Sequence, residues 1–240
     1  MHLDYLPLLQ VQREVYSLPR GMERFREYLK ALQNDARDDI DLPLVGMNPM
    51  AKEHVPALLD AYLALGADAI ASAAIARANA DGEGSFRVAL VVHDDLKGGW
   101  TNRFATEFSL RFESGAMRKR GWIVAPLWTS EEPSPAAVEA AVLAAVHRTA
   151  FIVRNGEAAT LGARMQQEGE ALHRAGARVG LDAEELAYTR EVLAPHLDSA
   201  SMPTTVVALF GDVAADSLSF PRLGLSPNAG LELALMDVRP

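Results

Sequence analysis

The segment from Val91 to Phe104 reads VVHDDLKGGWTNRF, and it places a dense group of polar side chains directly after an apolar run. Asp94 and Asp95 could serve as a general base or hold a divalent cation, because carboxylate oxygens do both. The neighbouring His93 could act as a second acid–base group. We therefore take His93, Asp94 and Asp95 as the candidate catalytic residues.

The rest of this segment is typical of a loop that binds a small polar or anionic molecule. Its candidate substrate-binding residues are Lys97, Trp100, Asn102 and Arg103. The two cations could neutralise an anionic ligand, and the tryptophan could stack on a ring or shield the site. The glycines at 98 and 99 would allow a ligand to approach backbone N–H groups closely.

No recognised catalytic signature accompanies these residues. The KGG sequence lacks the order of a phosphate-binding P-loop, and no HExxH, GxSxG or GxGxxG motif occurs. Metal and cofactor requirements therefore stay open. Asp, Lys and Gly are also common turn residues, so a capped turn without any chemistry is the alternative interpretation.

The apolar segment Phe86–His93 predicts the strand that carries these residues. It is apolar on both faces for most of its length, which is typical of a central strand in a covered sheet. Further apolar runs predict strands over residues 42–47, 121–128 and 203–212. The polar residues that follow these three strands are Asn48, Thr129, Ser130 and Asp212.

Open α/β sheets bind ligands beyond the carboxyl ends of their parallel strands. If the predicted strands are parallel, the polar groups that follow them converge at one rim of the sheet. A strand that runs antiparallel would place its group at the opposite rim. This argument adds Asn48 and Asp212 to the candidate substrate-binding residues.

Helical patterns alternate with these strands, which favours the α/β class. The predicted helices cover residues 19–33, 49–65, 67–80, 135–149, 158–176 and 183–193. Asn48, Ser134 and Asp182 are the expected N-caps, and Pro49 and Pro135 suit the first helical position.

The segment 104–112 is ambiguous. Phe108, Leu110 and Phe112 alternate as in a strand, whereas the phenylalanines at 104, 108 and 112 repeat as in a helix. We favour a strand from about Glu107, so that residues 104–127 form a hairpin-like piece. Residues 151–153 and 231–238 are interpreted as further short strands.

The expected fold is therefore α/β, with a mixed, largely parallel sheet covered by helices. We expect a single domain over residues 1–240, with a helical excursion over residues 155–200. A chain of this length can bury a core that needs no stabilising crosslinks.

The composition excludes several classes of site. Cysteine is absent, which excludes disulfides, thiolate catalysis and cysteine-based zinc sites. The net charge of −9 argues against a nucleic-acid partner, because phosphate backbones require a basic surface. The basic cluster at 118–120 fits a solvated turn.

The apolar content of 49% and the charged content of 23% are ordinary for a soluble globular protein. The N-terminal residues lack the pattern of a standard signal peptide, and apolar runs are too short for a membrane span. We expect a soluble, cytoplasmic protein without a membrane partner. Arginine greatly outnumbers lysine, which indicates a bacterial, GC-rich source.

Two functions remain open, and the sequence does not decide whether the protein is an enzyme. In the first, the protein is an enzyme that acts on a small polar or anionic substrate at the 93–103 loop. In the second, it is a non-catalytic binding or assembly protein, in which the alanine-rich helices at 51–80 and 135–149 form subunit interfaces. The alanine-rich helices also suggest a homodimer, because small side chains let backbones pack closely.

Overall fold

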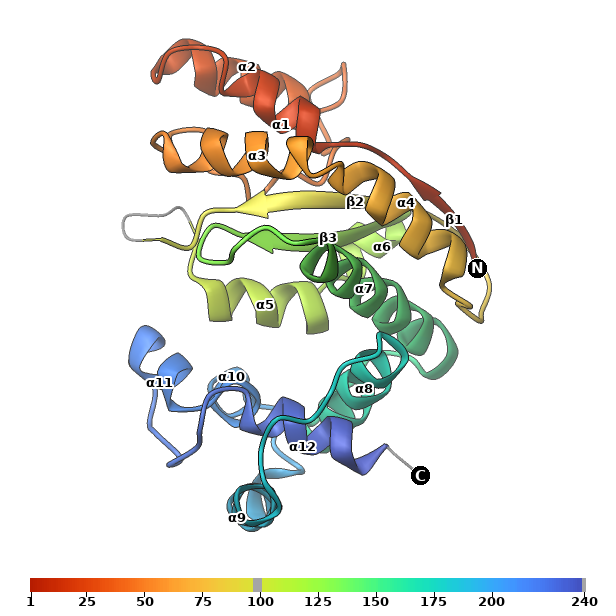
Figure 1. The fold of residues 1–240 in the computed structure, drawn as a ribbon, viewed down its shortest axis with the longest axis vertical. Coiled ribbons are helices and arrows are strands. Elements are labelled where there is room, and N and C mark those ends of the chain that lie inside the picture. The colour runs from red at the N-terminus through yellow and green to blue at the C-terminus, as the bar shows by residue number, and fades with distance from the viewer. Residues whose placement is uncertain (97–100, 239–240) are drawn as a thin grey trace. The chain divides into compact units, whose positions relative to one another are not determined.

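A computed structural model describes residues 1–96 and 101–238 of the chain (Figure 1). The chain divides into two compact units, each built from separate segments. Unit 1 consists of residues 1–79, 83–102 and 115–142, and unit 2 consists of residues 80–82, 103–114 and 143–240. The expectation of a single domain over residues 1–240 stays a prediction.

Unit 1 is built on a three-stranded parallel sheet in the order β1-β2-β3. The strands are β1 (His2–Tyr5), β2 (Ser85–His93) and β3 (Trp122–Trp128). Leu3 pairs with Phe86 in the first ladder, and Val88 pairs with Ile123 in the second. The central strand β2 is buried from Val88 to His93, which agrees with its apolar sequence on both faces.

Helices cover the sheet of unit 1, and in Figure 1 α1, α3 and α4 lie along one face of it. These helices are α1 (Leu9–Val15), α2 (Met22–Leu32), α3 (His54–Ala64), α4 (Ala67–Arg77), α6 (Gly115–Lys119) and the first part of α7 (Pro135–Asn155). Helix α1 packs on β2, α4 packs on β1 and α6 packs on β3.

A glutamine from α1 continues the hydrogen bonding of β2 where β1 ends. The backbone of Leu6 still donates to Val88 O at 2.9 Å, and the chain then turns into α1. The fully buried Gln12 side chain donates to Val92 O at 3.1 Å and accepts from Val92 N at 2.9 Å. This contact fixes α1 beside the last residues of β2, immediately before the candidate catalytic residues.

The regular elements of unit 2 are all helices within its described residues. Its helices are the second part of α7, then α5 (Arg103–Phe112), α8 (Leu161–Arg174), α9 (Ala183–Leu193) with a short 3₁₀ helix (Ala194–His196), α10 (Met202–Phe210), α11 (Asp212–Leu218) and α12 (Ala229–Asp237). Helix α12 packs against α8, α9 and α10. A Cβ atom at Gly169 would lie 2.2 Å from Ala234 O, so α8 and α12 approach each other closely because this residue is glycine.

The predicted α/β class, with a largely parallel sheet covered by helices, is confirmed. The helical excursion over residues 155–200 corresponds to α8 and α9. The capping argument for α7 is correct, because Ser134 Oγ accepts from Ala137 N at 3.1 Å. The predicted start of α9 is also confirmed, since the Asp182 carboxylate accepts a hydrogen bond from Glu185 N at 2.9 Å.

The predicted hairpin-like piece over residues 104–127 is wrong, and the described sheet is entirely parallel rather than mixed. Residues 103–112 form α5, so the four-residue repeat of phenylalanine was the correct pattern. Phe108 is buried, and Phe104 and Phe112 pack against the same core. The predicted strand at 42–47 is also wrong, because these residues form turns and irregular structure.

The strand predicted at 203–212 is wrong, since residues 203–210 belong to α10 and Asp212 begins α11. Ser201 caps this helix by accepting from Thr204 N at 3.4 Å, and Gly211 ends it with φ of 80°. The β-branched residues tolerate the helix because tertiary packing buries them. Val206, Ala208 and Phe210 are buried as expected, although on a helix.

The short strands predicted at 151–153 and 231–238 are wrong for a similar reason. Residues 151–153 belong to the last turns of α7, and residues 231–237 belong to α12. Each is an apolar run too short for its periodicity to separate a buried helix from a strand.

Helix α7 is long and apolar enough to cross a membrane by length and composition, and 56% of its apolar stretch is buried inside the structure. A bent pair formed by α3 and α4 meets the same criterion. Ala71, Ala74 and Ala145 are buried, so the alanine-rich helices contribute to the core. The expectations of a soluble protein without a membrane span and of a homodimer stay predictions.

Candidate functional site

The carboxyl ends of β2 and β3 meet at one rim of the sheet in unit 1, and Asp94 lies at this rim. His93 pairs with Trp128 as the last pair of the β2–β3 ladder. Beyond it, Thr129 N donates to His93 O at 3.1 Å. The backbone N–H of Asp95 in turn donates to Thr129 Oγ1 at 3.0 Å. The parallel strands thus bring the residues that follow them together.

The carboxylate of Asp94 is buried, with 2% of its surface exposed, and it is surrounded by hydrogen-bond donors. Its Oδ2 accepts from Asn48 Nδ2 at 2.8 Å. Its Oδ1 lies 2.8 Å from His54 Nε2 and 3.2 Å from Thr129 Oγ1. Because a buried carboxyl group is costly without partners, these contacts compensate for its burial and hold the Asp94 side chain in place.

His54 is the first residue of α3, and 33% of its side chain is exposed. Its Nε2 lies 2.8 Å from Oδ1 of Asp94, and because an ionised carboxylate only accepts hydrogen bonds, this contact favours the tautomer with the proton on Nε2. In the neutral ring, Nδ1 then keeps its lone pair and can accept a proton. A buried acid therefore orients a histidine that solvent and small molecules can reach.

The loop that carries Asn48 is fixed from several directions. Tyr16 donates its hydroxyl to Asn48 O at 2.6 Å. Asn48 Oδ1 accepts from Met50 N at 3.0 Å, and Asn48 O also accepts from Ala51 N at 3.0 Å. Burial raises the pKa of Tyr16, and the negative charge of Asp94 adds to this shift, so the hydroxyl stays a donor. Asn48 caps a turn rather than the predicted helix, since α3 begins six residues later.

Asp95 has a different role from Asp94. Its Oδ1 accepts from Ser130 N at 3.0 Å, and Ser130 Oγ donates to its Oδ2 at 2.6 Å. Thr129 Oγ1 also lies 3.0 Å from Asp95 Oδ1. These contacts match the capped turn that was the alternative interpretation of the segment. Asp95 stabilises the turn after β3, whereas Asp94 contacts the histidine.

His93 is buried beneath this rim rather than exposed at it, with 3% of its surface accessible. Its ring lies 5.2 Å from the ring of Trp128, measured between centroids. A Cβ atom at Gly46 would lie 2.1 Å from Cε1 of His93. The imidazole thus occupies the space that a side chain at position 46 would need, which gives His93 a packing role.

The segment after Asp95 returns to the end of β2, because Thr101 Oγ1 donates to Asp94 O at 2.9 Å. Asn102 follows directly in unit 1. The candidate residues Lys97 and Trp100, together with the glycines between them, lie outside the described residues. Their proposed contacts with a substrate stay predictions.

Two other candidates belong to unit 2. Arg103 begins α5 and lines a cavity within that unit. Asp212 begins α11, and its carboxylate accepts the backbone N–H groups of residues 223, 224 and 225 at 3.0 to 3.3 Å. Asp212 therefore holds a turn of its own unit, since it follows a helix and no strand leads it to the rim.

His54 was not among the residues proposed from the sequence. A histidine just before an apolar helix was visible in the printed sequence, but the pattern did not place it near β2. Thr129 and Ser130 were expected at the rim from the parallel arrangement of strands, without an assigned role. Within residues 1–96 and 101–238, no group of three or more histidine or acidic side chains is placed to hold a metal ion.

Comparison of the chain with protein-family models, with curated proteins and with solved structures found no match.

Proposed function

We propose that unit 1 catalyses a proton-transfer reaction on a small polar or anionic molecule, with His54 as the general base. The observation that supports this proposal is the 2.8 Å contact between His54 Nε2 and the buried Asp94 carboxylate. Histidine is suited to this task because its protonation changes near neutral pH. The pair lies at the carboxyl rim of parallel strands, where open α/β sheets bind their ligands.

The proposed proton transfer involves His54 and Asp94, which lie at this rim. Nδ1 of His54 takes a proton from a hydroxyl of the substrate or from an attacking water, and the electron pair of that O–H bond stays on oxygen. The resulting imidazolium remains bonded to Asp94 through Nε2, so the carboxylate stabilises the new positive charge. Asn48 and Thr129 keep Asp94 from rotating away. Lys97, Trp100 and Asn102 remain the proposed contacts with the substrate.

The tautomer of His54 provides a test that needs no substrate. Long-range ¹H–¹⁵N NMR distinguishes a protonated Nε2 from a protonated Nδ1 in a neutral imidazole. We expect the Nε2–H tautomer for His54, identified by loss of its signals in His54→Gln. In Asp94→Asn this preference should weaken. A wild-type His54 protonated on Nδ1 would contradict the proposal.

Activity is tested on a panel of p-nitrophenyl esters and p-nitrophenyl phosphate, together with small hydroxy acids as alternative substrates. His54→Gln keeps an N–H donor for Asp94 and removes the base, so it should lower turnover about 10²- to 10⁴-fold. The matched control is His2→Gln, which alters a histidine that pairs with Asp4 at 3.1 Å on the exposed surface. Full activity in His54→Gln would exclude His54 as the base, and a wild type that turns over none of these substrates would favour a non-catalytic binding or assembly role.

A further inference from the structure

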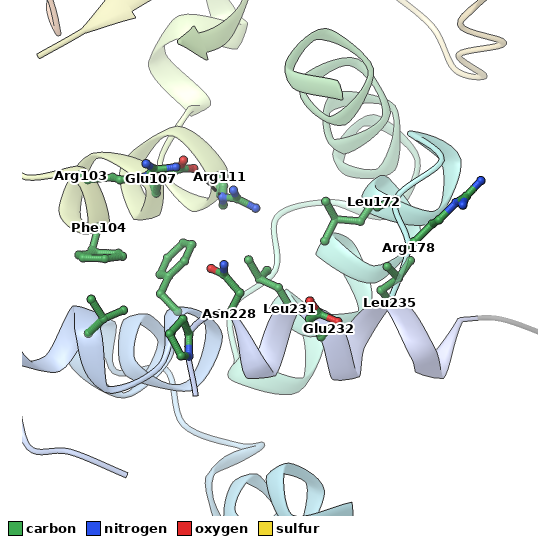
Figure 2. A pocket seen from close by; sticks show the side chains of 14 residues that line it. Arg103, Phe104, Glu107, Arg111, Leu172, Arg178, Asn228, Leu231, Glu232 and Leu235 are labelled. Carbon is green, nitrogen blue, oxygen red and sulfur yellow. Dashed lines mark hydrogen bonds and ion pairs between the residues drawn. The ribbon is translucent and has the colours of Figure 1, made fainter. Parts of the chain in front are cut away.

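Unit 2 contains a cavity that the chemistry of unit 1 does not use. Its volume is about 470 Å³, and it is lined by α5, α8 with the residues that follow it, α10, α11 and α12 (Figure 2). Pockets for small molecules commonly have volumes of about 300 to 1,000 Å³. The cavity is therefore large enough for a ligand of several carbon atoms.

Much of the cavity wall is apolar. Phe104 of α5 and Phe210 of α10 line it, with ring centroids 5.6 Å apart. Leu231 and Leu235 from α12 and Leu172 from α8 also line it, and Figure 2 shows these side chains gathered between the helices. This wall suits a hydrocarbon or aromatic body, because it removes apolar ligand surface from water.

One mostly buried guanidinium on the wall has N–H groups without a protein acceptor among the described residues. Arg111 is 13% exposed, and it donates through Nε to Glu107 Oε2 at 2.8 Å and through Nη1 to Glu168 Oε2. A guanidinium carries five N–H groups, so these two bonds leave three. Among the residues that the structure describes, no acceptor bonds to Nη2 of Arg111. An arginine that is mostly buried normally finds acceptors for its donors.

The acidic residues near the cavity, in contrast, already have donors. Glu168 accepts from Arg148 Nε at 2.6 Å and from Arg148 Nη2 at 2.9 Å, in addition to Arg111. Glu232, which lines the cavity, accepts from the backbone N–H groups of Gly180 and Leu181. Two further guanidinium residues, at 103 and 178, contribute to the lining. Nη2 of Arg111 is therefore the group at this wall that still needs an acceptor, which favours an anionic ligand.

We propose that this cavity binds a small carboxylate with an apolar body, seated with its carboxylate on Arg111. A planar carboxylate fits the planar fork of a guanidinium and can accept two N–H groups at once. A single negative charge balances the lining, which holds three arginines and two glutamates. The body of the ligand would lie against Phe104, Phe210 and Leu231.

Three probes of equal chain length test the class of ligand. Binding of octanoate, octylamine and octanol to the full chain is measured by titration calorimetry at neutral pH. We expect octanoate to bind at least tenfold more tightly than either of the other two. Octylamine or octanol binding as tightly as octanoate would overturn the proposal, as would the absence of octanoate binding at millimolar concentration.

Two variants locate the binding. Leu172→Trp fills the cavity from its wall, and His173→Trp places the same side chain at the next, exposed position of α8 as a control. Leu172→Trp should weaken octanoate binding at least tenfold, and His173→Trp should leave it unchanged. Arg111→Lys keeps a positive charge for Glu168 but removes the fork, and it should also weaken octanoate binding about tenfold.

Circular dichroism confirms that each variant is folded before its affinity is compared. If Leu172→Trp does not fold, Arg111→Lys still decides the outcome. Octanoate binding to both folded variants with wild-type affinity would contradict the proposal. His54→Gln should bind octanoate like the wild type, so failure of the proposed function and failure of this inference can be told apart.

Discussion

Oδ1 of Asp94 lies 2.8 Å from Nε2 of His54, although 40 residues separate them in the chain. The adjacent carboxylate of Asp95 contacts Ser130 instead, at 2.6 Å from its hydroxyl. Two neighbouring acids at the end of one strand thus serve different purposes. Asp94 is the acid that organises the candidate site, and Asp95 stabilises a turn.

Asparagine substitutions should separate these two roles. In Asp94→Asn, one carboxylate oxygen becomes an NH₂ group that faces donors, so the free energy of unfolding should fall by about 2–4 kcal/mol. In Asp95→Asn the loss should stay below about 1 kcal/mol, because asparagine caps turns almost as well as aspartate. Urea unfolding of both variants measures the difference. Equal losses would show that the two carboxylates do not differ in this way.

The contact between Gly46 and His93 predicts a coupled pair. Gly46→Ala places a Cβ atom where the His93 ring lies, so it should destabilise the protein by about 1–3 kcal/mol through overcrowding. Combining Gly46→Ala with His93→Ala should cost less than the sum of the single changes, since the second change makes room for the first. Additive effects in a double-mutant cycle would place the His93 ring elsewhere.

Two buried tyrosines form a matched pair for a third prediction. Among the described residues, the buried hydroxyl of Tyr62 has no hydrogen-bond partner, whereas the hydroxyl of Tyr16 donates to Asn48 O. Tyr62→Phe should leave stability unchanged or increase it, because it removes a hydroxyl that lost its water without compensation. Tyr16→Phe should lower stability by about 1 kcal/mol.

Burial raises the pKa of Tyr62 to about 12, and the negative charges of Glu131 and Glu132 add to this shift. The hydroxyl of Tyr62 therefore stays protonated throughout the range in which unfolding is measured. Thermal unfolding of the two phenylalanine variants at neutral pH compares them directly. A larger loss in Tyr62→Phe than in Tyr16→Phe would contradict this prediction.

The buried ion pairs of unit 2 predict a loss of stability in acid. Burial alone would raise the pKa of Glu168, but the guanidinium groups of Arg148 and Arg111 outweigh it and lower the pKa to about 2. The unfolded chain therefore binds a proton at higher pH than the folded protein does. The stabilisation is complete above the ordinary glutamate pKa and is lost as pH falls toward about 2.

This shift from the ordinary value of 4.5 corresponds to about 3 kcal/mol. Chemical unfolding between pH 7 and pH 2 should show the decline, and Glu168→Gln should show a shallower one. Glu170→Gln, at a side chain that is 27% exposed and pairs with Arg174, provides a less buried control on the same helix α8. A decline of the same steepness in Glu168→Gln as in the wild type would exclude Glu168 as its source.

Parts of the fold could be predicted because the information is local. The apolar run of β2 identifies a central strand, and Ser134 and Asp182 mark helix starts through contacts three residues away. The segment 203–210 was misassigned because its valines and threonines favour strands intrinsically, while the cap at Ser201 and the glycine at 211 favour a helix. In this segment the capping residues at both ends predicted the helix better than the strand propensity of the residues between them.

The contacts that build the candidate site were less predictable because they depend on tertiary packing. The rim position of Asp94 followed from the end of β2. Asn48 was proposed because it follows a strand predicted at 42–47, which is wrong, so its contact with Asp94 comes from a loop instead. His54 reaches Asp94 only because α3 packs against α1, and no local pattern reports such packing. In unit 2, Arg111 of α5 and Glu168 of α8 are 57 residues apart in the chain and form an ion pair. This pairing could not be predicted from the sequence either.

The pairing of Gln12 with Val92 has a consequence for how the protein behaves in a crowded solution. A strand that extends past its neighbour presents a free N–H and C=O, and another polypeptide can add a strand to them. Gln12 occupies both groups of Val92 with its own amide. These two groups of Val92 are therefore not available for intermolecular strand addition, so one side chain shields this residue of the central strand from edge-to-edge pairing.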